Sequence, residues 1–124
     1  MLSSAQKRRY ARHLLLAEIG EAGQERLCAA RVRVPDAADA RAMAVARAYL
    51  ERAGLELSDG FDARGVEPGD VKAVQALAGR PELEPAAAAL LGAFAAVEAI
   101  KQVIGAGEPG ALPPALSLAG KVQP

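Results

Sequence analysis

A strand, a helix and a second strand follow one another in the first half of the chain, and this order constrains the fold more than any other feature. Residues 31–34 (RVRV) alternate charged and β-branched side chains, as a short strand does, and Pro35 ends the segment. Apolar residues then recur at spacings of three and four over about residues 37–53, which predicts an amphipathic helix capped by Asp36. Residues 55–57 are the predicted second strand. A strand–helix–strand unit is typical of a parallel sheet.

Further helices are predicted on both sides of this unit. Ser3 and Gln6 have the spacing of a capping box, which predicts a first helix at the N-terminus. A helical turn over residues 24–28 leads into the first strand. After the second strand, Asp70 and Gly79 delimit a short helix, and the strongest helix runs from about Glu82 or Pro85 to Ile104.

The remaining segments are predicted mainly as loops. Residues 61–69 are rich in Gly, Asp and Pro and are predicted as a loop, and residues 105–114 as a linker. Leu116 and Leu118 are expected to form a last short strand. Gly54 is placed to end the helix that precedes the second strand.

Alanine supplies much of the 52% apolar fraction, and aromatic residues supply only 3%. Alanine favours helix but buries little area per residue, so we expect a thin core that a partner chain would help to stabilise. On the longest predicted helix, Ala88, Gly92 and Ala96 form a line of small residues where a second helix can approach closely. We expect one small, helix-dominated α/β domain with two or three short parallel strands and about four helices.

The charge and cysteine content exclude several classes of protein. Fifteen basic and fifteen acidic residues give a formal net charge of zero, which does not provide the basic surface of a nucleic-acid-binding protein. The single cysteine, Cys28, excludes an internal disulfide and a cysteine-based zinc site. The uncharged run 85–97 is too short to span a bilayer, and residues 7–16 lack the pattern of a signal peptide. We therefore expect a cytoplasmic protein with no nucleic-acid or membrane partner.

Two segments resemble the MoeB/ThiF/HesA family of ubiquitin-activating-type adenylating enzymes. Residues 9–34 (RYARHLLLAEIGEAGQERLCAARVRV) are similar to the opening of that family, in which an arginine-containing helix and a Gly-x-x-Gly-Gln turn precede the first strand. Residues 85–109 resemble its late helix, with a Gly…Glu-Ala-Ile-Lys pattern. The resemblance implies one cut-down Rossmann-like domain. Its parts would be N-terminal helices and first strand (1–34), a βα unit without the glycine-rich loop (35–60), a linker and short helix (61–84), and the late helix with a C-terminal strand (85–124).

The chain departs from the family where the family binds nucleotide. Members carry a Gly-x-Gly-Gly-x-Gly loop after the first strand, whose glycines let the backbone approach phosphate. Here residues 35–41 read PDAADAR, and Asp36 and Asp39 place negative charges there, each opposing a phosphate by about 1 kcal/mol. Residues 58–84 are too few to hold the family's ATP, magnesium, catalytic and zinc-binding residues. Asp59 has the place of the ribose-binding acid, but Ser-Asp-Gly is more typical of a turn.

Arg9 and Arg12 are the candidate nucleotide-contacting residues. In the resembling enzymes the arginine at the spacing of Arg12 reaches the nucleotide site of the neighbouring subunit, and the planar guanidinium suits phosphate. The alternative is that both arginines belong to a solvated helix face. Cys28 is expected to be a buried structural thiol, and His13 a packing or capping residue.

Three functions stay open. The first is a non-catalytic subunit, with no cofactor, that dimerises with itself or with a full-length family member and has a ubiquitin-like or sulfur-carrier protein as a further partner. The second is an active adenylyltransferase, which would use ATP and magnesium to activate the C-terminal carboxylate of such a protein. The third is an evolutionary remnant without selected activity.

Overall fold

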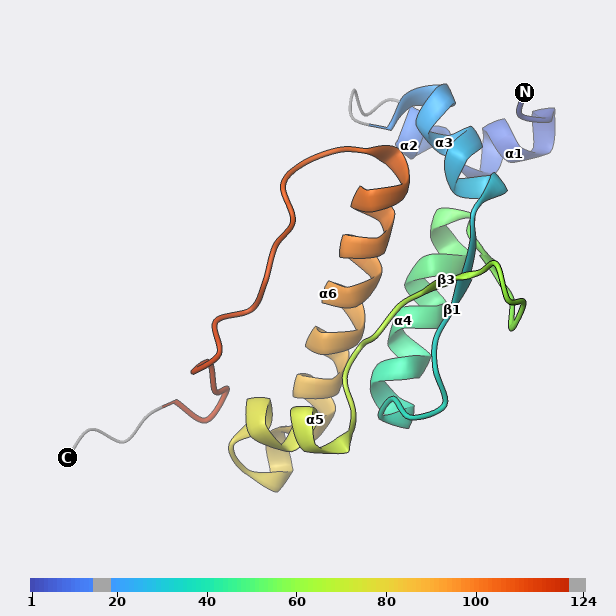
Figure 1. Cartoon of the computed structure of the whole chain (residues 1–124). Helices are drawn as coiled ribbons and strands as arrows, with labels where there is room; N and C mark the ends of the chain where they lie inside the picture. The colour runs from blue at the N-terminus through green and yellow to red at the C-terminus, as the bar shows by residue number, and fades with distance from the viewer. Residues whose placement is uncertain (15–18, 121–124) are drawn as a thin grey trace.

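A short parallel sheet and two long helices form the centre of the chain, as the computed structural model shows (Figure 1). The structure describes residues 1–14 and 19–120. Helices account for 57% of the described residues, so the predicted helix-dominated α/β class is confirmed. In chain order the elements are α1 (Ser4–Arg9), α2 (Ala11–Leu14), α3 (Gly20–Ala29), β1 (Arg31–Arg33), α4 (Ala40–Ala53), β2 (Glu56–Leu57), β3 (Arg64–Gly65), α5 (Val71–Ala78), the 3-10 helix η1 (Pro81–Leu83) and α6 (Glu84–Ile104).

The three strands are parallel and lie in the order β2-β1-β3. β1 and β2 are joined through α4, as the strand–helix–strand pattern predicts. β2 and β3 are joined by residues 58–63 alone, although a connection between parallel strands ordinarily takes about a dozen residues or more. The short loop suffices because Val32 pairs with both Leu57 and Arg64, so β2 ends at the level where β3 begins.

This loop crosses β1 on the face of the sheet that carries the arginines. Arg31 Nη1 lies 2.9 Å from an Asp62 carboxylate oxygen, and Arg33 Nη1 donates to the Gly60 carbonyl at 3.4 Å. Because side chains alternate along a strand, Val32 points to the opposite face, where it is fully buried. In the described part of the chain, the sheet therefore has helices on one face and a polar loop on the other.

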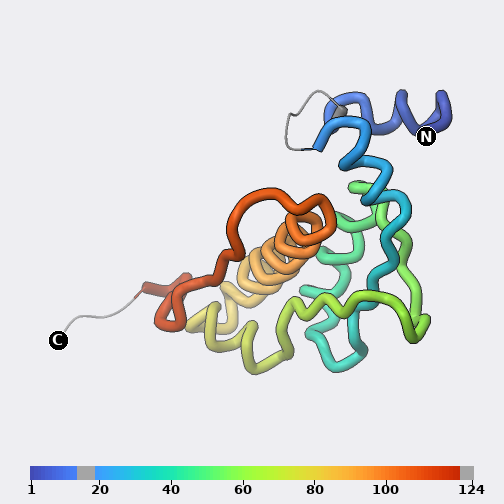
Figure 2. Tube along the Cα trace, turned by 45° about the horizontal axis from the view of Figure 1, so that its top comes forward, coloured from blue at the N-terminus to red at the C-terminus, as the bar shows by residue number. Residues whose placement is uncertain are grey.

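α4 and α6 cover the buried face of the sheet and supply much of the core, and Figure 2 shows them side by side. A second, smaller cluster holds α5 against the first turns of both helices. The larger cluster consists of Leu27, Val32, Val34, Leu50, Ala53, Leu55, Val66, Ala96 and Ala99. Small and β-branched side chains dominate it, as the composition predicts.

Small residues on α6 allow the two long helices to approach closely. Ala88, Gly92 and Ala96 are buried, and the helix that meets this line at Gly92 is α4 of the same chain. A Cβ atom added at Gly92 would overlap the carbonyl oxygen of Ala42 and would lie 2.9 Å from Val45 Cβ. At this point α6 therefore packs with its backbone, rather than with a side chain, against α4.

Several helices begin or end at the cap residues that the sequence indicates. Ser3 and Gln6 form both hydrogen bonds of the predicted capping box at α1. Gly54, Gly79 and Gly105 follow α4, α5 and α6 in the left-handed conformation that glycine adopts most readily.

The start of α4 differs from the prediction. The helix begins at Ala40, and Asp39 caps it in place of Asp36. The reason is a turn before the helix, in which the Ala38 N–H donates to the Pro35 carbonyl at 3.1 Å. This turn uses the residues that the apolar pattern assigned to the first turn of the helix.

Two further predictions on strands are wrong. Residues 61–69, predicted as a loop, contain β3, because pairing with β1 is a tertiary contact that local composition does not reveal. Residues 116–118, predicted as a strand, are not a strand. The Leu118 N–H instead donates to the Leu77 carbonyl at 2.7 Å, so this segment docks on α5 rather than on the sheet.

By length and composition alone, the helix over residues 81–104 is apolar enough to cross a membrane, because an 18-residue window within it has a mean hydropathy of 1.6. The uncharged run 85–97 is too short for such a span, but the continuous helix extends beyond it. Only 28% of the most apolar window is buried, and core helices of other proteins meet the same criterion. Most of the larger apolar side chains of this helix are half-buried, and Val97 is exposed.

Replacing Gly92 with alanine tests the close contact of α4 and α6. At an exposed helix position this change stabilises a protein by about 1 kcal/mol. Here we expect a loss of about 1–3 kcal/mol in the free energy of unfolding, because the new methyl group forces the helices apart. Urea unfolding measures the difference, with the exposed Ala89→Gly of the same helix as the control for helix propensity. A Gly92→Ala protein more stable than the wild type would show that the helices are not in contact there.

Candidate functional site

The N-terminus of α4 follows the first strand, and a carboxylate of this chain occupies it. Asp39 Oδ1 accepts hydrogen bonds from the backbone N–H groups of Arg41 at 2.8 Å and Ala42 at 3.2 Å. The Asp39 side chain is only 3% exposed. Free backbone N–H groups at a helix N-terminus are what binds a phosphate. At α4, two of these donors are already used by the protein itself.

Arg41 neutralises this carboxylate and ties it to α6. Its Nη2 lies 3.0 Å from Asp39 Oδ2 and 3.0 Å from Glu84 Oε1, which belongs to the first turn of α6. The hydrogen bond from the Arg41 side chain is the largest cause that holds the pKa of Asp39 below its usual value, and the backbone N–H groups act in the same direction. Asp39 is therefore a stable anion that closes the N-terminus of α4.

The crevice at the carboxyl end of β1 is also unsuited to a polyphosphate. Ligands of open α/β sheets ordinarily bind at this end of the strands. Here a hollow of about 420 Å³ is lined by Pro35, Ala37, Ala38, Glu67, Gly69, Asp70 and Ala73. Its charged lining residues are both acidic, so it repels phosphate. Residues 1–14 and 19–120 contain no group of three or more His, Cys, Asp or Glu side chains that could hold a metal ion.

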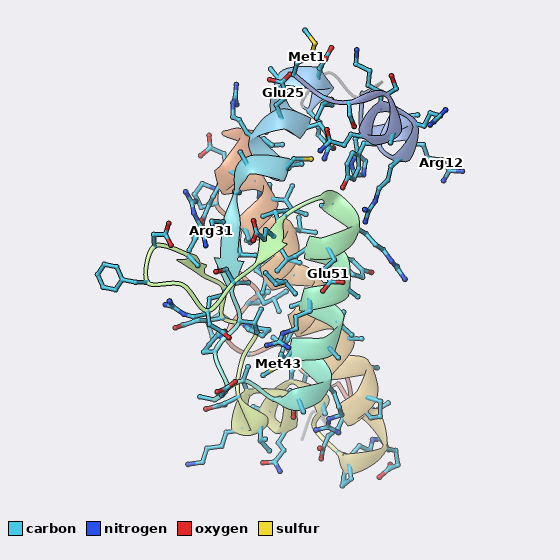
Figure 3. The ribbon with its side chains drawn as sticks, turned by 90° about the vertical axis from the view of Figure 1, so that its right-hand side faces the viewer. Met1, Arg12, Glu25, Arg31, Met43 and Glu51 are labelled. Atoms are coloured by element: carbon cyan, nitrogen blue, oxygen red, sulfur yellow. The ribbon has the colours of Figure 1, made fainter. Side chains whose placement is uncertain are left out.

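Arg9 and Arg12 lie at the other end of the domain, next to the C-terminus of α4. Arg9 Nη2 donates to the Glu51 carbonyl at 3.4 Å, and the Arg9 guanidinium lies 5.3 Å from the centre of the Tyr10 ring. Arg12 is exposed on α2, and Figure 3 shows its side chain pointing away from the body of the protein. Arg9 therefore has contacts within the chain, whereas Arg12 faces outward.

Gln24 is the centre of a polar cluster that holds the N-terminal helices on α4. Its side chain is completely buried. Nε2 donates to the Ala53 carbonyl at 2.8 Å and lies 3.6 Å from Cys28 Sγ, and Oε1 lies 2.8 Å from His13 Nδ1. One amide thus connects α2, α3 and the last turn of α4.

These hydrogen bonds determine the tautomer of His13. A carbonyl only accepts, so Gln24 must turn Nε2 toward Ala53 and Oε1 toward His13. His13 Nδ1 therefore donates, and Nε2 remains the acceptor of the neutral ring. The Tyr10 ring stacks on His13 with 5.9 Å between ring centres, and burial raises the pKa of Tyr10.

The cluster brings together residues that the sequence pattern left separate. Cys28 is half-buried beside Gln24 and Tyr10, not fully buried as a structural thiol was expected to be. Gly54, which ends α4, leaves room for the cluster because it has no side chain. A Cβ atom at this position would lie 2.8 Å from Gln24 Nε2 and 3.0 Å from the Tyr10 hydroxyl. Residues 20–24 are predicted as a Gly-x-x-Gly-Gln turn by resemblance alone, whereas in the structure they are the beginning of α3. Nothing in their spacing indicates that Gln24 is buried and connects three helices.

The other candidate residues have ordinary structural roles. Asp59 is exposed in a turn after β2, in which Ser58 Oγ accepts from the Gly60 N–H at 3.0 Å. The ion pair of Arg41 with Asp39 is not predicted from the sequence, although an arginine two residues after a capping aspartate is a local signal that indicates such a pair.

Comparison of the chain with protein-family models, curated proteins and solved structures found no match.

Replacing Gln24 with leucine tests the polar cluster. The change keeps the volume but leaves the Ala53 carbonyl and His13 Nδ1 without their partner. We expect a loss of about 2–3 kcal/mol in the free energy of unfolding, measured in urea. The exposed Glu21→Gln on the same helix is the control and should change stability by less than about 0.5 kcal/mol. Equal stability of the two variants would mean that the cluster contributes nothing.

Replacing Asp39 with asparagine tests the charge at the N-terminus of α4. The pKa of Asp39 in the folded chain is lower than its usual 3.8. The Asp39 charge therefore contributes fully to stability at a pH above 3.8, and this contribution is lost as the pH falls through the pKa of the folded chain. Asparagine also caps helices well, so the variant retains the cap and loses only the charge. We expect the stability of the wild type to fall more steeply than that of Asp39→Asn below about pH 4. Thermal unfolding between pH 7 and pH 2 measures this, and parallel curves would contradict it.

Proposed function

We propose that this chain is a non-catalytic relative of the MoeB/ThiF/HesA adenylating enzymes that acts as a dimerising or helper subunit in the cytoplasm. The observation that carries the proposal is the buried Asp39 carboxylate at the N-terminus of α4. It takes the donors that a nucleotide phosphate would need, and Arg41 holds it in place. The acidic hollow beside it supports the same conclusion.

We further propose that the domain is a cut-down Rossmann-like unit. The parallel β1–α4–β2 unit supports this, as does the position of β3 on the other side of β1. A complete unit of this kind has helices on both faces of its sheet, and here the loop 58–63 takes the place of a helical crossover.

The position of Arg12 supports a role in a partner subunit rather than in its own. The N-terminal helices dock at the C-terminus of α4, through Gln24 and Arg9. α4 has 14 residues, so about 21 Å separates its two ends. Arg12 is thus one helix length from the site that Asp39 closes, and it points outward.

The exposed side of the two long helices is a suitable place for that partner. Val97 on α6 and Tyr49 on α4 are 45% and 43% exposed. Between the helices, a hollow of about 230 Å³ is lined by His13, Tyr49, Arg52, Ala53 and Ile100. Apolar surface of this kind is typical of an interface, so we propose a second copy or a full-length family member as the partner.

Isothermal titration with ATP and magnesium tests the proposal. The chain alone should show no binding at ATP concentrations up to about 1 mM, because its phosphate site is closed. Added to a full-length MoeB-type enzyme, it should raise the affinity for ATP about tenfold, as one bidentate phosphate contact can. Arg12→Ala should abolish this gain, and Arg8→Ala, which removes an exposed arginine of α1, should not.

Two results would contradict this function. Micromolar binding of ATP to the isolated chain would show that a nucleotide site exists and would favour the adenylyltransferase alternative. A mixture in which the chain neither associates with the enzyme nor changes its affinity for ATP would exclude the helper role.

A further inference from the structure

The outer edge of β3 has unpaired backbone groups. In a parallel pair the N–H and C=O of one residue point to the same side, and those of the next residue point to the other. The Val66 N–H donates to the Arg33 carbonyl at 2.8 Å, so Arg64 and Val66 face β1. Gly65 and Glu67 therefore face away from the sheet. Among residues 1–14 and 19–120, the backbone groups of Gly65 have no hydrogen-bond partner on that side.

A groove runs beside this edge, between the segment after β3 and α6. Figure 1 shows the segment passing across the side of α6 before it reaches α5. The hollow has a volume of about 290 Å³, and its floor consists of side chains on one face of α6. The lining residues of α6 are Leu91, Phe94, Ala95, Glu98, Ala99 and Gln102. Their apolar members provide a surface for the side chains of a segment that pairs with β3.

The charged residues of the groove are both acidic. Glu98 is paired with Lys101 Nζ at 2.8 Å, whereas Glu67 is exposed at the edge itself. Because side chains alternate, Glu67 and Gly65 point to the face opposite α6. Arg33 pairs with Gly65 and points to the same face, so a basic residue of a bound segment fits beside Glu67 and not beside Gly65. Its apolar neighbours on both sides would then lie over α6.

We propose that the edge of β3 and the adjoining groove bind an extended peptide segment with the pattern apolar–basic–apolar, which adds to the sheet as a fourth strand. The backbone of such a segment supplies both an acceptor for the N–H and a donor for the C=O of Gly65. Pro68 is buried just beyond the edge, so the pairing covers only a few residues. This site is independent of Arg12 and of the proposed helper function.

The probe is the peptide Gly-Val-Lys-Val-Gly with a fluorescein label, and fluorescence anisotropy measures its binding to the full chain. We expect a Kd of roughly 0.1–1 mM, because the contact is small. The same peptide with glutamate for lysine should bind at least about fivefold more weakly, since Glu67 repels it. Peptides N-methylated at the lysine or at both valines test the pairing, because alternate amides face β3. One of the two methylated peptides should no longer bind, namely the one whose methyl groups are on the amides that face β3. Equal affinity of the parent peptide and both methylated peptides would overturn the proposal.

Variants at Gly65 give the matching test on the protein. Gly65→Pro removes only the outward N–H and keeps the bonds to β1, so peptide affinity should fall about fivefold, as the loss of one hydrogen bond predicts. Gly65→Ala is the control: its Cβ would lie 3.9 Å from the Arg33 side chain, and binding should stay within about twofold. Circular dichroism establishes that both variants are folded. Undiminished binding to a folded Gly65→Pro protein would also overturn strand addition, and the methylated peptides decide the question if that variant does not fold.

Discussion

The contact between α4 and α6 is the interaction on which the rest of the structure depends. Gly92 lets the backbones of the two helices meet, and together they form the surface that buries Val32 and the remaining core residues of the sheet. In a chain with few large apolar side chains, area is gained by close approach rather than by side-chain size. Each end of α4 then carries one polar assembly, Asp39 with Arg41 at the start and Gln24 at the end.

These two polar assemblies have different roles in the domain. At the start of α4, a buried carboxylate and its arginine fill the place of an anion, so the helix dipole is already satisfied within the chain. At the other end, Gln24 holds the helices that carry Arg12 on the surface. Our proposal of a subunit that acts on a partner rests on these two features, the closed site and the exposed arginine one helix length away.

Sequence and structure agree best where the determinants are local. The capping box at Ser3, the glycines after α4 and α5, and the line of small residues through Gly92 are all found where the pattern places them. They agree least where a segment needs a distant partner. β3 lacks any local strand signal and forms because Val32 and Arg33 are available to pair with it, whereas Leu118 has a strand-like pattern but meets α5.

The sequence by itself determined the helix-dominated α/β class, the succession of β1, α4 and β2, and the absence of a glycine-rich loop, because helical periodicity, caps and turn residues act over a few neighbouring positions. Only the tertiary structure decided which aspartate caps α4, that Arg41 reaches Glu84, and that Gln24 connects three helices. It also decided that β3 is the edge of the sheet with a groove beside it. These features depend on residues far apart in the chain that meet once the small side chains of α6 bring it against α4.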